Sequence, residues 1–395
     1  YAYKDAKCLK AADIKRPVVV GFGPAGIFAA LLLAKNGLRP IVIERGECVE
    51  ERKESVDRFW NEGKLNPESN VSFGEGGAGT FSDGKLNTLV KDTFGRNKFV
   101  LETLVEYGAP KEILYDNKPH IGTDLLTGIV KSIREEIIRL GGEVRFDTKL
   151  IDIEDINKKS KHIKVLNTKT NQTEDIPCED IILALGHSAR DTFKLLKDLN
   201  IYMEPKAFAL GIRVSHSQNL IDVSQYGKKE AAFLSPAPYK LTFRSSFDRG
   251  VYSFCMCPGG FIVNASTEGE RIAVNGMSYH KRDSGEANSA IIVSVSEEDF
   301  DKFGDKDDPL KGIEFQRRLE AYKMGEGKVP VQRLVDFLDG VESTDFETAD
   351  LKIKGATKIS RVDKLFPTEI YESMKEAFKD FDRKIKGFIN ENAYV

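Results

Sequence analysis

The chain has 395 residues, of which 41% are hydrophobic and 31% charged, and its formal net charge is −3. This is the composition of a globular protein with a large core, and the near-neutral charge argues against a nucleic-acid partner. We recognise no apolar run near the roughly 18 residues of a membrane span, no secretory signal and no disulfide framework among five scattered cysteines, so we expect a cytoplasmic protein that binds no membrane.

The strongest signal is a strand–turn–helix–strand pattern near the start of the sequence. The apolar run Val18 to Val20 predicts a buried parallel strand. Apolar residues then recur at helical spacing from Ile27 to Leu32, and a second short strand, Ile41 to Ile43, follows. The turn between the first strand and the helix reads Gly21-Phe22-Gly23-Pro24-Ala25-Gly26.

Each glycine of this turn has a physical task in binding a dinucleotide. Gly21 permits the tight bend, Gly23 lets a pyrophosphate approach the backbone, and Gly26 lets the helix pack closely on the strand. Pro24 and Ala25 open the helix, whose first N–H groups attract the phosphates. The alternative is a glycine turn in an ordinary βαβ unit.

Glu44 and Arg45 end the second strand. The Glu44 carboxylate is suited to accept hydrogen bonds from ribose hydroxyls, and it would repel a 2′-phosphate. Arg45 would suit a 2′-phosphate, but it can as well lie flat on the adenine ring. Together with the turn, these residues predict a dinucleotide site that does not take NADP.

The segments that follow favour FAD over NAD. About a hundred residues, with helical periodicity in 97–108 and 124–140, intervene before the next parallel strand, 143–146. The next segments predict short alternating strands at 150–153, 162–166 and 173–176, which would form a small antiparallel meander. An apolar run, 181–185, then predicts a strand that returns to the parallel sheet, and it ends at Ala184-Leu185-Gly186. This is the layout of glutathione-reductase-like flavoproteins.

A second glycine-rich segment follows the first helix–strand unit. Gly74, Gly76, Gly77, Gly79 and Gly84 fall within eleven positions, which suggests backbone pressed against something flat or phosphate-like. A flexible surface loop is the alternative.

With these motifs the chain resembles the family of uncharacterised FAD-dependent dehydrogenases, which are NAD(P)/FAD-dependent oxidoreductases with a glutathione-reductase-like FAD-binding fold. The resemblance covers nearly the whole sequence and is most distinctive in residues 73–86 and in the Cys-Met-Cys segment, 254–260. It implies FAD as cofactor and places the glycine-rich segment at the flavin and pyrophosphate. It also implies a final Gly-Glu or Gly-Asp segment that contacts the flavin, and nothing after Phe388 resembles one.

The expected cofactor-binding residues come from these segments. They are Gly21, Gly23, Pro24, Ala25, Gly26, Glu44, Arg45, Gly74, Gly76, Gly77, Ala78, Gly79, Thr80, Ser82, Lys85, Leu150, Ala184, Leu185 and Gly186. Lys85 and Asp83 are expected near the isoalloxazine, where a lysine would tune the flavin. A surface salt bridge explains Lys85 equally well.

The catalytic residues stay open. Cys255 and Cys257 lack the Cys-x-x-Cys or Cys-x4-Cys spacing of flavin disulfide reductases. On a regular strand both thiols share one face, as substrate-facing thiols or as buried packing. Lys85 and His187 are the other candidates. No histidine pair has metal-ligand spacing, so we expect no metal site.

The expected fold is α/β: a glutathione-reductase-like FAD/NAD(P)-binding fold with a second, mixed α+β substrate domain. We place the FAD-binding domain at 15–205 with a helical insertion at about 60–140, the substrate domain at 206–365 with strands 208–214, 260–265 and 271–275, and a return toward the FAD domain at 366–395.

The expected function is an FAD-dependent oxidoreductase, or dehydrogenase, that transfers hydride to or from a small-molecule substrate. NAD(P)H would be a transient reductant, because no second Gly-x-Gly-x-x-Gly occurs. The alternatives are a flavin-binding module without turnover and a flavin-dependent RNA-modifying enzyme. The sequence indicates neither the substrate nor the oligomeric state.

Overall fold

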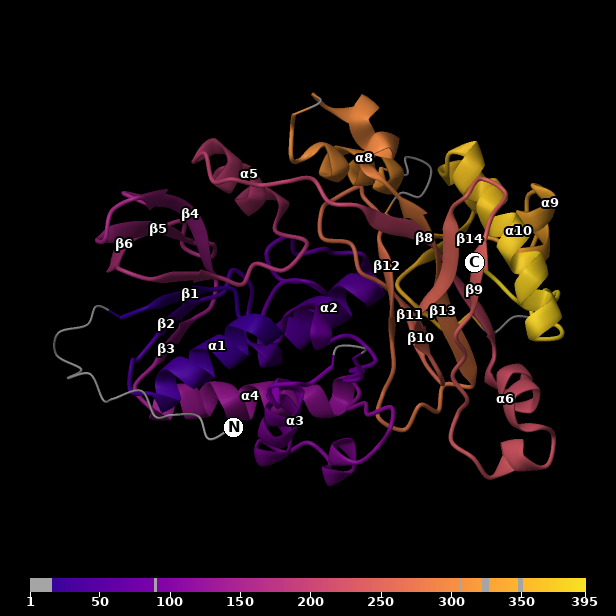
Figure 1. The fold of residues 1–395 in the computed structure, drawn as a ribbon, viewed down its shortest axis with the longest axis horizontal. Coiled ribbons are helices and arrows are strands. Elements are labelled where there is room, and N and C mark those ends of the chain that lie inside the picture. Colours follow the sequence, from indigo (N-terminus) through magenta and orange to yellow (C-terminus); the bar gives the residue numbers. More distant parts are fainter. Residues whose placement is uncertain (1–15, 89–90, 306, 322–326, 347–350) are drawn as a thin grey trace. The chain divides into compact units, whose positions relative to one another are not determined.

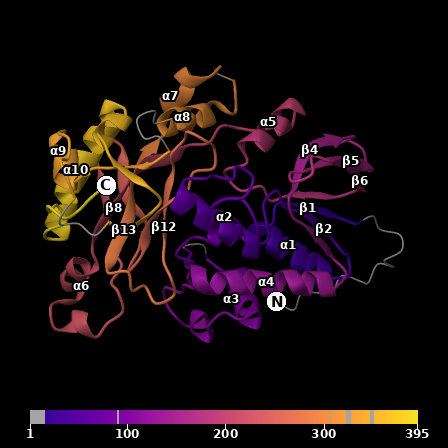
Figure 2. The ribbon, with the colours of Figure 1, turned by 180° about the vertical axis from the view of Figure 1, so that it is seen from behind.

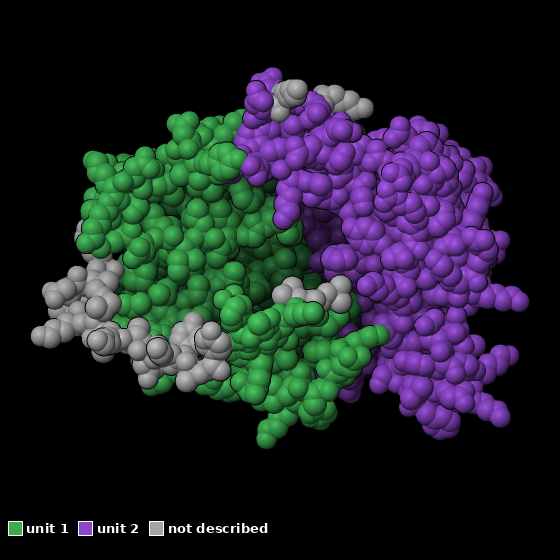
Figure 3. All heavy atoms as spheres, viewed as in Figure 1, with its two compact units in different colours: residues 1–59, 65–202 green, residues 60–64, 203–395 purple. Residues whose placement is uncertain are grey.

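The computed structural model describes residues 16–88, 91–305, 307–321, 327–346 and 351–395. Their contacts divide the chain into two compact units, coloured separately in Figure 3. Within the described chain, unit 1 comprises residues 16–59 and 65–202, and unit 2 comprises residues 60–64 and 203–395.

Unit 1 is built on a parallel sheet with strand order β3-β2-β1-β7. The strands are β1 (Val18–Val20), β2 (Ile41–Ile43), β3 (Glu143–Arg145) and β7 (Ile181–Leu183). The first two are completely buried, as expected for parallel strands covered on both faces. The structure therefore confirms the parallel strand predicted after residue 140 and shows that it pairs with β2.

Two helices supply most of the core of unit 1. Helices α1 (Pro24–Lys35) and α4 (Thr123–Arg139) run side by side in both ribbon views (Figures 1 and 2). Leu31 of α1 and Ile133 of α4 share a buried cluster with Val19 and Val42 of the sheet. Helix α4 was expected in an insertion, but its apolar face forms part of this central core.

The remaining elements of unit 1 include the antiparallel meander predicted from the sequence. Its sheet has the order β4-β5-β6, formed by β4 (Thr148–Glu154), β5 (Lys161–Asn167) and β6 (Thr173–Cys178). The helices are α2 (Val49–Glu62), α3 (Arg96–Glu106) and α5 (Arg190–Asp198), with short 3₁₀ turns η1 (Gly77–Gly79) and η2 (Lys111–Leu114).

Unit 2 is a mixed α+β unit around an antiparallel sheet of order β8-β13-β10-β9. Two smaller sheets have the orders β12-β11-β15 and β14-β16. The strands are β8 (Phe208–Ser217), β9 (Thr242–Arg244), β10 (Gly250–Cys257), β11 (Phe261–Asn264), β12 (Val274–Met277), β13 (Glu286–Val295), β14 (Val329–Val331), β15 (Ile353–Lys354) and β16 (Thr357–Ile359).

The helices of unit 2 pack on this framework. They are α6 (Gln218–Tyr226), α7 (Glu297–Phe300), α8 (Lys311–Glu320), α9 (Leu334–Asp339) and α10 (Thr368–Lys384), with 3₁₀ turns η3 (Glu230–Ala232), η4 (Asp301–Phe303) and η5 (Val362–Leu365). The strands expected at 208–214 and 260–265 are present, whereas the one expected at 271–275 begins three residues later and ends two residues later, as β12.

The C-terminal segment belongs to unit 2, in contrast to the expected return of residues 366–395 to the FAD domain. Phe378 and Phe381 of α10 are completely buried in a cluster with Val214 and Ile291 of the central sheet. Tyr394 exchanges main-chain hydrogen bonds with Ser215. The apolar periodicity of this helix is therefore satisfied inside unit 2.

Candidate functional site

The dinucleotide turn of unit 1 packs its glycines as the sequence predicts. Gly21 has a φ of +97°, and a Cβ there would collide with the main-chain oxygen of Ala184 at the end of β7. A Cβ on Gly26 would collide with the oxygen of Gly21. Both positions therefore require glycine so that strand, turn and helix can approach one another.

Gly23 differs from its two neighbours because the fold has room for a side chain there. A Cβ on Gly23 would meet only the Gly77 Cα, at 3.6 Å, and its φ of −77° suits any residue. Gly23 is the N-cap of α1, no side chain caps the helix, and Pro24 and Ala25 are exposed. The helix thus offers an open, electropositive amino end beside a bare backbone.

Glu44 is 5% exposed and ties three loops together through its carboxylate. One oxygen accepts a hydrogen bond from the Phe22 N–H at 2.7 Å, and the other accepts from the N–H groups of Gly46 and Gly74 at 3.0 Å each. A carboxylate offers about four acceptor positions, so one remains for a ribose hydroxyl.

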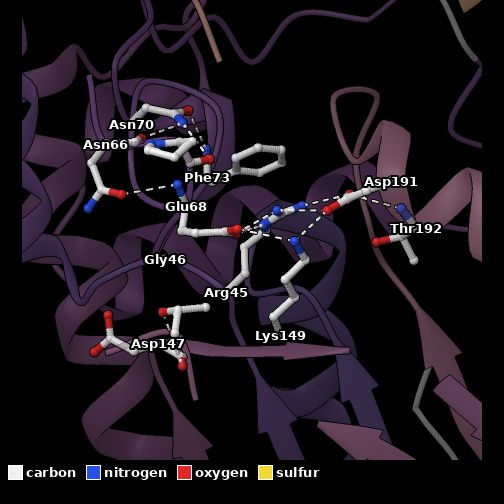
Figure 4. Close-up of polar contacts among 12 residues, drawn as sticks. Arg45, Gly46, Asn66, Glu68, Asn70, Phe73, Asp147, Lys149, Asp191 and Thr192 are labelled. Atoms are coloured by element: carbon white, nitrogen blue, oxygen red, sulfur yellow. Dashed lines mark hydrogen bonds and ion pairs between the residues drawn. The ribbon is translucent and has the colours of Figure 1, made fainter. Parts of the chain in front are cut away.

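Arg45 joins an ionic network that the sequence analysis did not foresee (Figure 4). Its guanidinium makes two 2.9 Å hydrogen bonds to Asp191 and one of 2.7 Å to Glu68, and Lys149 also pairs with both carboxylates. The guanidinium lies 4.3 Å from the centre of the Phe73 ring. Burial alone would raise the pKa of Asp191, but hydrogen bonds and charge from Arg45 and Lys149 lower it far below its usual value.

The structure brings the glycine-rich segment onto the dinucleotide turn. A Cβ on Gly77 would lie 2.9 Å from the Gly23 Cα, and one on Gly79 would lie 3.5 Å from the Pro24 ring. The Gly76 N–H donates to the Phe22 oxygen at 2.9 Å. Two glycine segments separated by fifty residues therefore form one backbone surface at the start of α1.

Arg52 holds this glycine-rich segment in place, and our sequence analysis missed it. It is completely buried and donates to four main-chain carbonyl oxygens at 2.5–3.0 Å, those of Asn70, Val71, Glu75 and Gly77. Burial lowers the pKa of Arg52 to about 10, although nearby carboxylates raise it. The spacing of Val49, Arg52, Val56 and Phe59 on one face of α2 was the available signal.

The polar residues after the glycines serve the loop itself. Thr80 donates to the Glu75 oxygen at 3.2 Å, and Ser82 donates to the Gly79 oxygen at 2.7 Å. Lys85 lies 3.4 Å from the carboxylate of Asp83, which is 3% exposed. The lysine is thus in an ion pair, and its expected flavin contact stays a prediction.

The remaining expected residues of unit 1 lie on two segments. Ala184 donates to the Val20 oxygen at 2.8 Å, and Leu185 and Gly186 continue the chain past the turn. His187 is exposed and its ring contacts the Ser188 hydroxyl at 2.8 Å. Leu150 is 4% exposed within the meander.

Cys255 and Cys257 belong to unit 2, and the prediction that they share one face is wrong. Phe254 pairs with Ala290 but Cys257 pairs with Asn288, so β10 carries one extra residue opposite β13. This β-bulge interrupts the alternation of side chains. Cys255 is exposed, with a φ of +42°, whereas Cys257 is 1% exposed.

These residues fit FAD. The uncapped α1 amino end and the bare Gly23 backbone suit a diphosphate, and the remaining acceptor position of Glu44 suits a ribose. Within the described residues, no helix is long and apolar enough to span a bilayer. The same residues contain no group of three or more His, Cys, Asp or Glu side chains able to hold a metal ion.

Two family models match the chain in succession. Residues 15–202 match the pyridine nucleotide-disulphide oxidoreductase family, and residues 207–395 match the C-terminal domain-like region of FAD-dependent proteins. A Clostridium beijerinckii protein, named only as an uncharacterised protein, is 51% identical over 386 residues, which are 96% of this chain and 70% of that protein.

Solved structures give weaker matches. A flavoprotein/dehydrogenase from Cytophaga hutchinsonii matches with a TM-score of 0.36 and 13% identity, over 73% of this chain and 57% of that one. A flavin-dependent monooxygenase in complex with FAD and substrate matches with a TM-score of 0.35 and 15% identity, over 72% of this chain and 50% of that one.

Three findings thus agree on the same family. They are the sequence matches over both units, the parallel sheet followed by a dinucleotide turn, and the second α+β unit. The chain belongs to a family of FAD-dependent oxidoreductases with a glutathione-reductase-like FAD-binding fold.

Proposed function

We propose that unit 1 binds FAD on the backbone surface formed by the dinucleotide turn and the glycine-rich segment, and that the protein is an oxidoreductase acting on a small-molecule substrate. The observation that carries this proposal is the contact of Gly77 with Gly23 beside the uncapped start of α1. The dinucleotide turn and the glycine-rich segment both present backbone without side chains at the electropositive start of α1. This arrangement suits the diphosphate of a dinucleotide cofactor such as FAD.

The chain's own residues would divide the binding between them. The first N–H groups of α1 would hold the diphosphate, and the Glu44 carboxylate would accept a ribose hydroxyl. Arg52 would keep the glycine-rich carbonyls turned inward, away from the phosphates. Bound FAD would supply two-electron chemistry, exchanging a hydride with the substrate.

Lys85 and His187 stay the proposed polar side chains of the reaction in unit 1. The Lys85 ammonium is held by the buried Asp83 carboxylate, which restricts its position. His187 is exposed and is the side chain that follows Gly186. We propose NAD(P)H as the transient reductant, acting in the cytoplasm.

The test of cofactor binding is the Gly23→Ala substitution. Its methyl group would sit in ordinary contact with the Gly77 Cα, so the fold should keep its stability, while the methyl group would occupy the space of the diphosphate. We expect FAD affinity, measured by flavin fluorescence titration, to fall about 100-fold, which corresponds to about 3 kcal/mol.

The matched control is Gly128→Ala in α4, where a Cβ would meet nothing within 4 Å. This exposed helical position should gain a few tenths to about 1 kcal/mol of stability and keep its FAD affinity. Unchanged binding in Gly23→Ala, with both variants folded, would place the cofactor elsewhere.

The test of turnover is anaerobic reduction. FAD-loaded protein should lose its absorbance at about 450 nm when NADH or NADPH is added, because flavin reduction abolishes that band. Bleaching by either nucleotide supports the oxidoreductase. FAD that binds stoichiometrically and is bleached by neither nucleotide contradicts the proposed reductant, and the Gly23→Ala result would still stand.

A further inference from the structure

The bulge in β10 separates two thiols that lie two residues apart in the chain. Cys255 is exposed and has a φ of +42°, a conformation that costs a non-glycine residue about 1 kcal/mol or more. Cys257 is 1% exposed, and its thiol donates a hydrogen bond to the main-chain oxygen of Cys255 at 3.2 Å. One sulfur therefore faces solvent while the other lies directly behind the same bend of backbone.

A buried cation lies beside the inner sulfur. Arg213 of β8 is 6% exposed, and its guanidinium lies 3.7 Å from the Cys257 sulfur and 2.7 Å from the Cys255 oxygen. Its other acceptors are the amide oxygens of Asn288, at 2.9 Å, and Asn275, at 3.4 Å. No carboxylate among the described residues pairs with Arg213, which is costly for a buried charge.

One buried donor beside this cation lacks an acceptor among the described residues. The side-chain N–H₂ of Asn288, which is completely buried, has no hydrogen-bond acceptor in the described chain. Gly276 is needed for the arrangement, because a Cβ there would collide with the guanidinium and lie 2.7 Å from the Cys257 sulfur. Of the side chains that accept a hydrogen bond from Arg213, only Cys257 has an ionisable group, so the guanidinium would stabilise a thiolate formed there during the reaction.

Tyr239 is the other titratable side chain that faces this cluster. Burial raises its pKa, so its phenol stays neutral and does not compensate the Arg213 charge.

We propose that Cys255 and Cys257 are a redox-active thiol pair in unit 2, in which a hydroperoxide oxidises Cys255 and Cys257 resolves the product as an intramolecular disulfide. All residues of this proposal belong to unit 2, and its test does not require bound FAD. The exposed position of Cys255 gives the oxidant access, and the Arg213 cation prepares the Cys257 sulfur as the second nucleophile.

The chemistry balances with the hydroperoxide as oxidant. The Cys255 sulfur attacks one peroxide oxygen, the O–O bond breaks, and a sulfenic acid and one water or alcohol form. The Cys257 sulfur then attacks the Cys255 sulfur, the S–O bond breaks, and the oxygen leaves as water. Two thiols thus lose two electrons and two protons, which the peroxide takes up.

The experiment treats the full chain with hydrogen peroxide, quenches with an alkylating reagent, and maps each cysteine by mass spectrometry. We expect the peptide that carries both cysteines to lose two hydrogen atoms and to regain them with dithiothreitol. Cys48 is the internal reference, because burial raises its pKa; Cys255 should be oxidised at least about tenfold faster. Equal rates at Cys48 and Cys255, or disulfides formed only between molecules, would overturn the proposal.

Variants separate the roles of the two sulfurs. Cys257→Ser should stop at the sulfenic acid, trapped on Cys255 by dimedone, whereas Cys255→Ser should leave Cys257 reduced. Cys48→Ser is the matched control and should behave as the wild type.

The role of Arg213 has its own test. Arg213→Gln should slow disulfide formation about tenfold without changing the initial oxidation of Cys255, and Arg213→Lys should restore part of the rate. The peptide map of the wild-type chain can contradict the proposed disulfide by itself, even if a variant fails to fold. A wild-type chain unfolded in urea that forms the disulfide as fast as the folded chain would refute any role for this geometry.

Discussion

Arg52 is the residue whose removal should reveal most about unit 1. Its guanidinium is completely buried and holds four carbonyl oxygens of the segment from Asn70 to Gly77. Its aliphatic stem occupies the space where a Cβ on Gly74 would lie. We predict that Arg52→Met, which keeps much of the stem and removes the donors, destabilises unit 1 and loosens the glycine-rich segment.

The magnitude follows from the contacts. A buried carbonyl that loses its donor costs about 1–3 kcal/mol, and entry of water or relaxation of the loop recovers part of this. Four such carbonyls therefore suggest a loss of about 3–6 kcal/mol, at the upper end for one substitution. Arg52→Lys keeps the charge but not the planar fork, so we expect an intermediate loss.

The assay combines a global and a local measurement. Denaturation of the FAD-free protein reports the stability, and hydrogen exchange of the Gly76 and Gly77 amides reports the order of the segment. FAD titration should show affinity falling about 100-fold, because binding must then order the loop again. Arg58→Met is the control, since Arg58 is exposed on the same helix and should shift stability by less than about 0.5 kcal/mol.

Two results would refute this reasoning. Wild-type FAD affinity in a folded Arg52→Met variant would mean that the glycine-rich segment does not form part of the cofactor site. Unchanged exchange of the Gly76 and Gly77 amides would mean that other contacts, such as the one from Gly76 to Phe22, are enough to hold the loop.

Two further predictions test each unit separately. Glu44→Gln should destabilise unit 1 by about 2–3 kcal/mol and weaken FAD, because one amide oxygen cannot replace a carboxylate that accepts from three N–H groups; a melting temperature equal to the wild type would contradict this. In unit 2, burial lowers the pKa of His216 from 6.5 to about 4. The unfolded chain binds more protons between these values, so stability should fall as pH drops through that window, by up to about 3 kcal/mol. His216→Gln should flatten this dependence in urea denaturation, and an unchanged slope would assign it to other groups.

The sequence alone determined the local architecture of unit 1. The Val18–Val20 run, the glycine spacing after it and the helical period that follows are encoded within about thirty residues, so the turn and its strand and helix were predictable. The meander strands β4 to β6 were predictable for the same reason, since apolar positions recur within each of them between polar turns.

The tertiary structure decided what holds the candidate site together. Arg52 looks like an ordinary charged residue in the sequence, and Glu44 was expected to meet a ribose rather than to join loops. All partners of Arg52 and two of the three partners of Glu44 lie 18–30 residues away. These hydrogen bonds go to main-chain atoms, which nearly every residue type has. The sequence of the partner segment therefore does not predict them. The place of residues 366–395 in unit 2 likewise depends on which core accepts their apolar face.

The thiol pair is the clearest case in which the sequence did not predict the environment of a side chain. Cys255 and Cys257 alternate in the sequence and were expected on one face, but the extra residue in β10 exists only relative to its pairing with β13. Arg213, which gives the inner sulfur its cation, comes from β8 and reaches the cluster through that same sheet. Local pattern fixes which residues form strands, whereas register, burial and charge partners arise only when distant strands pair.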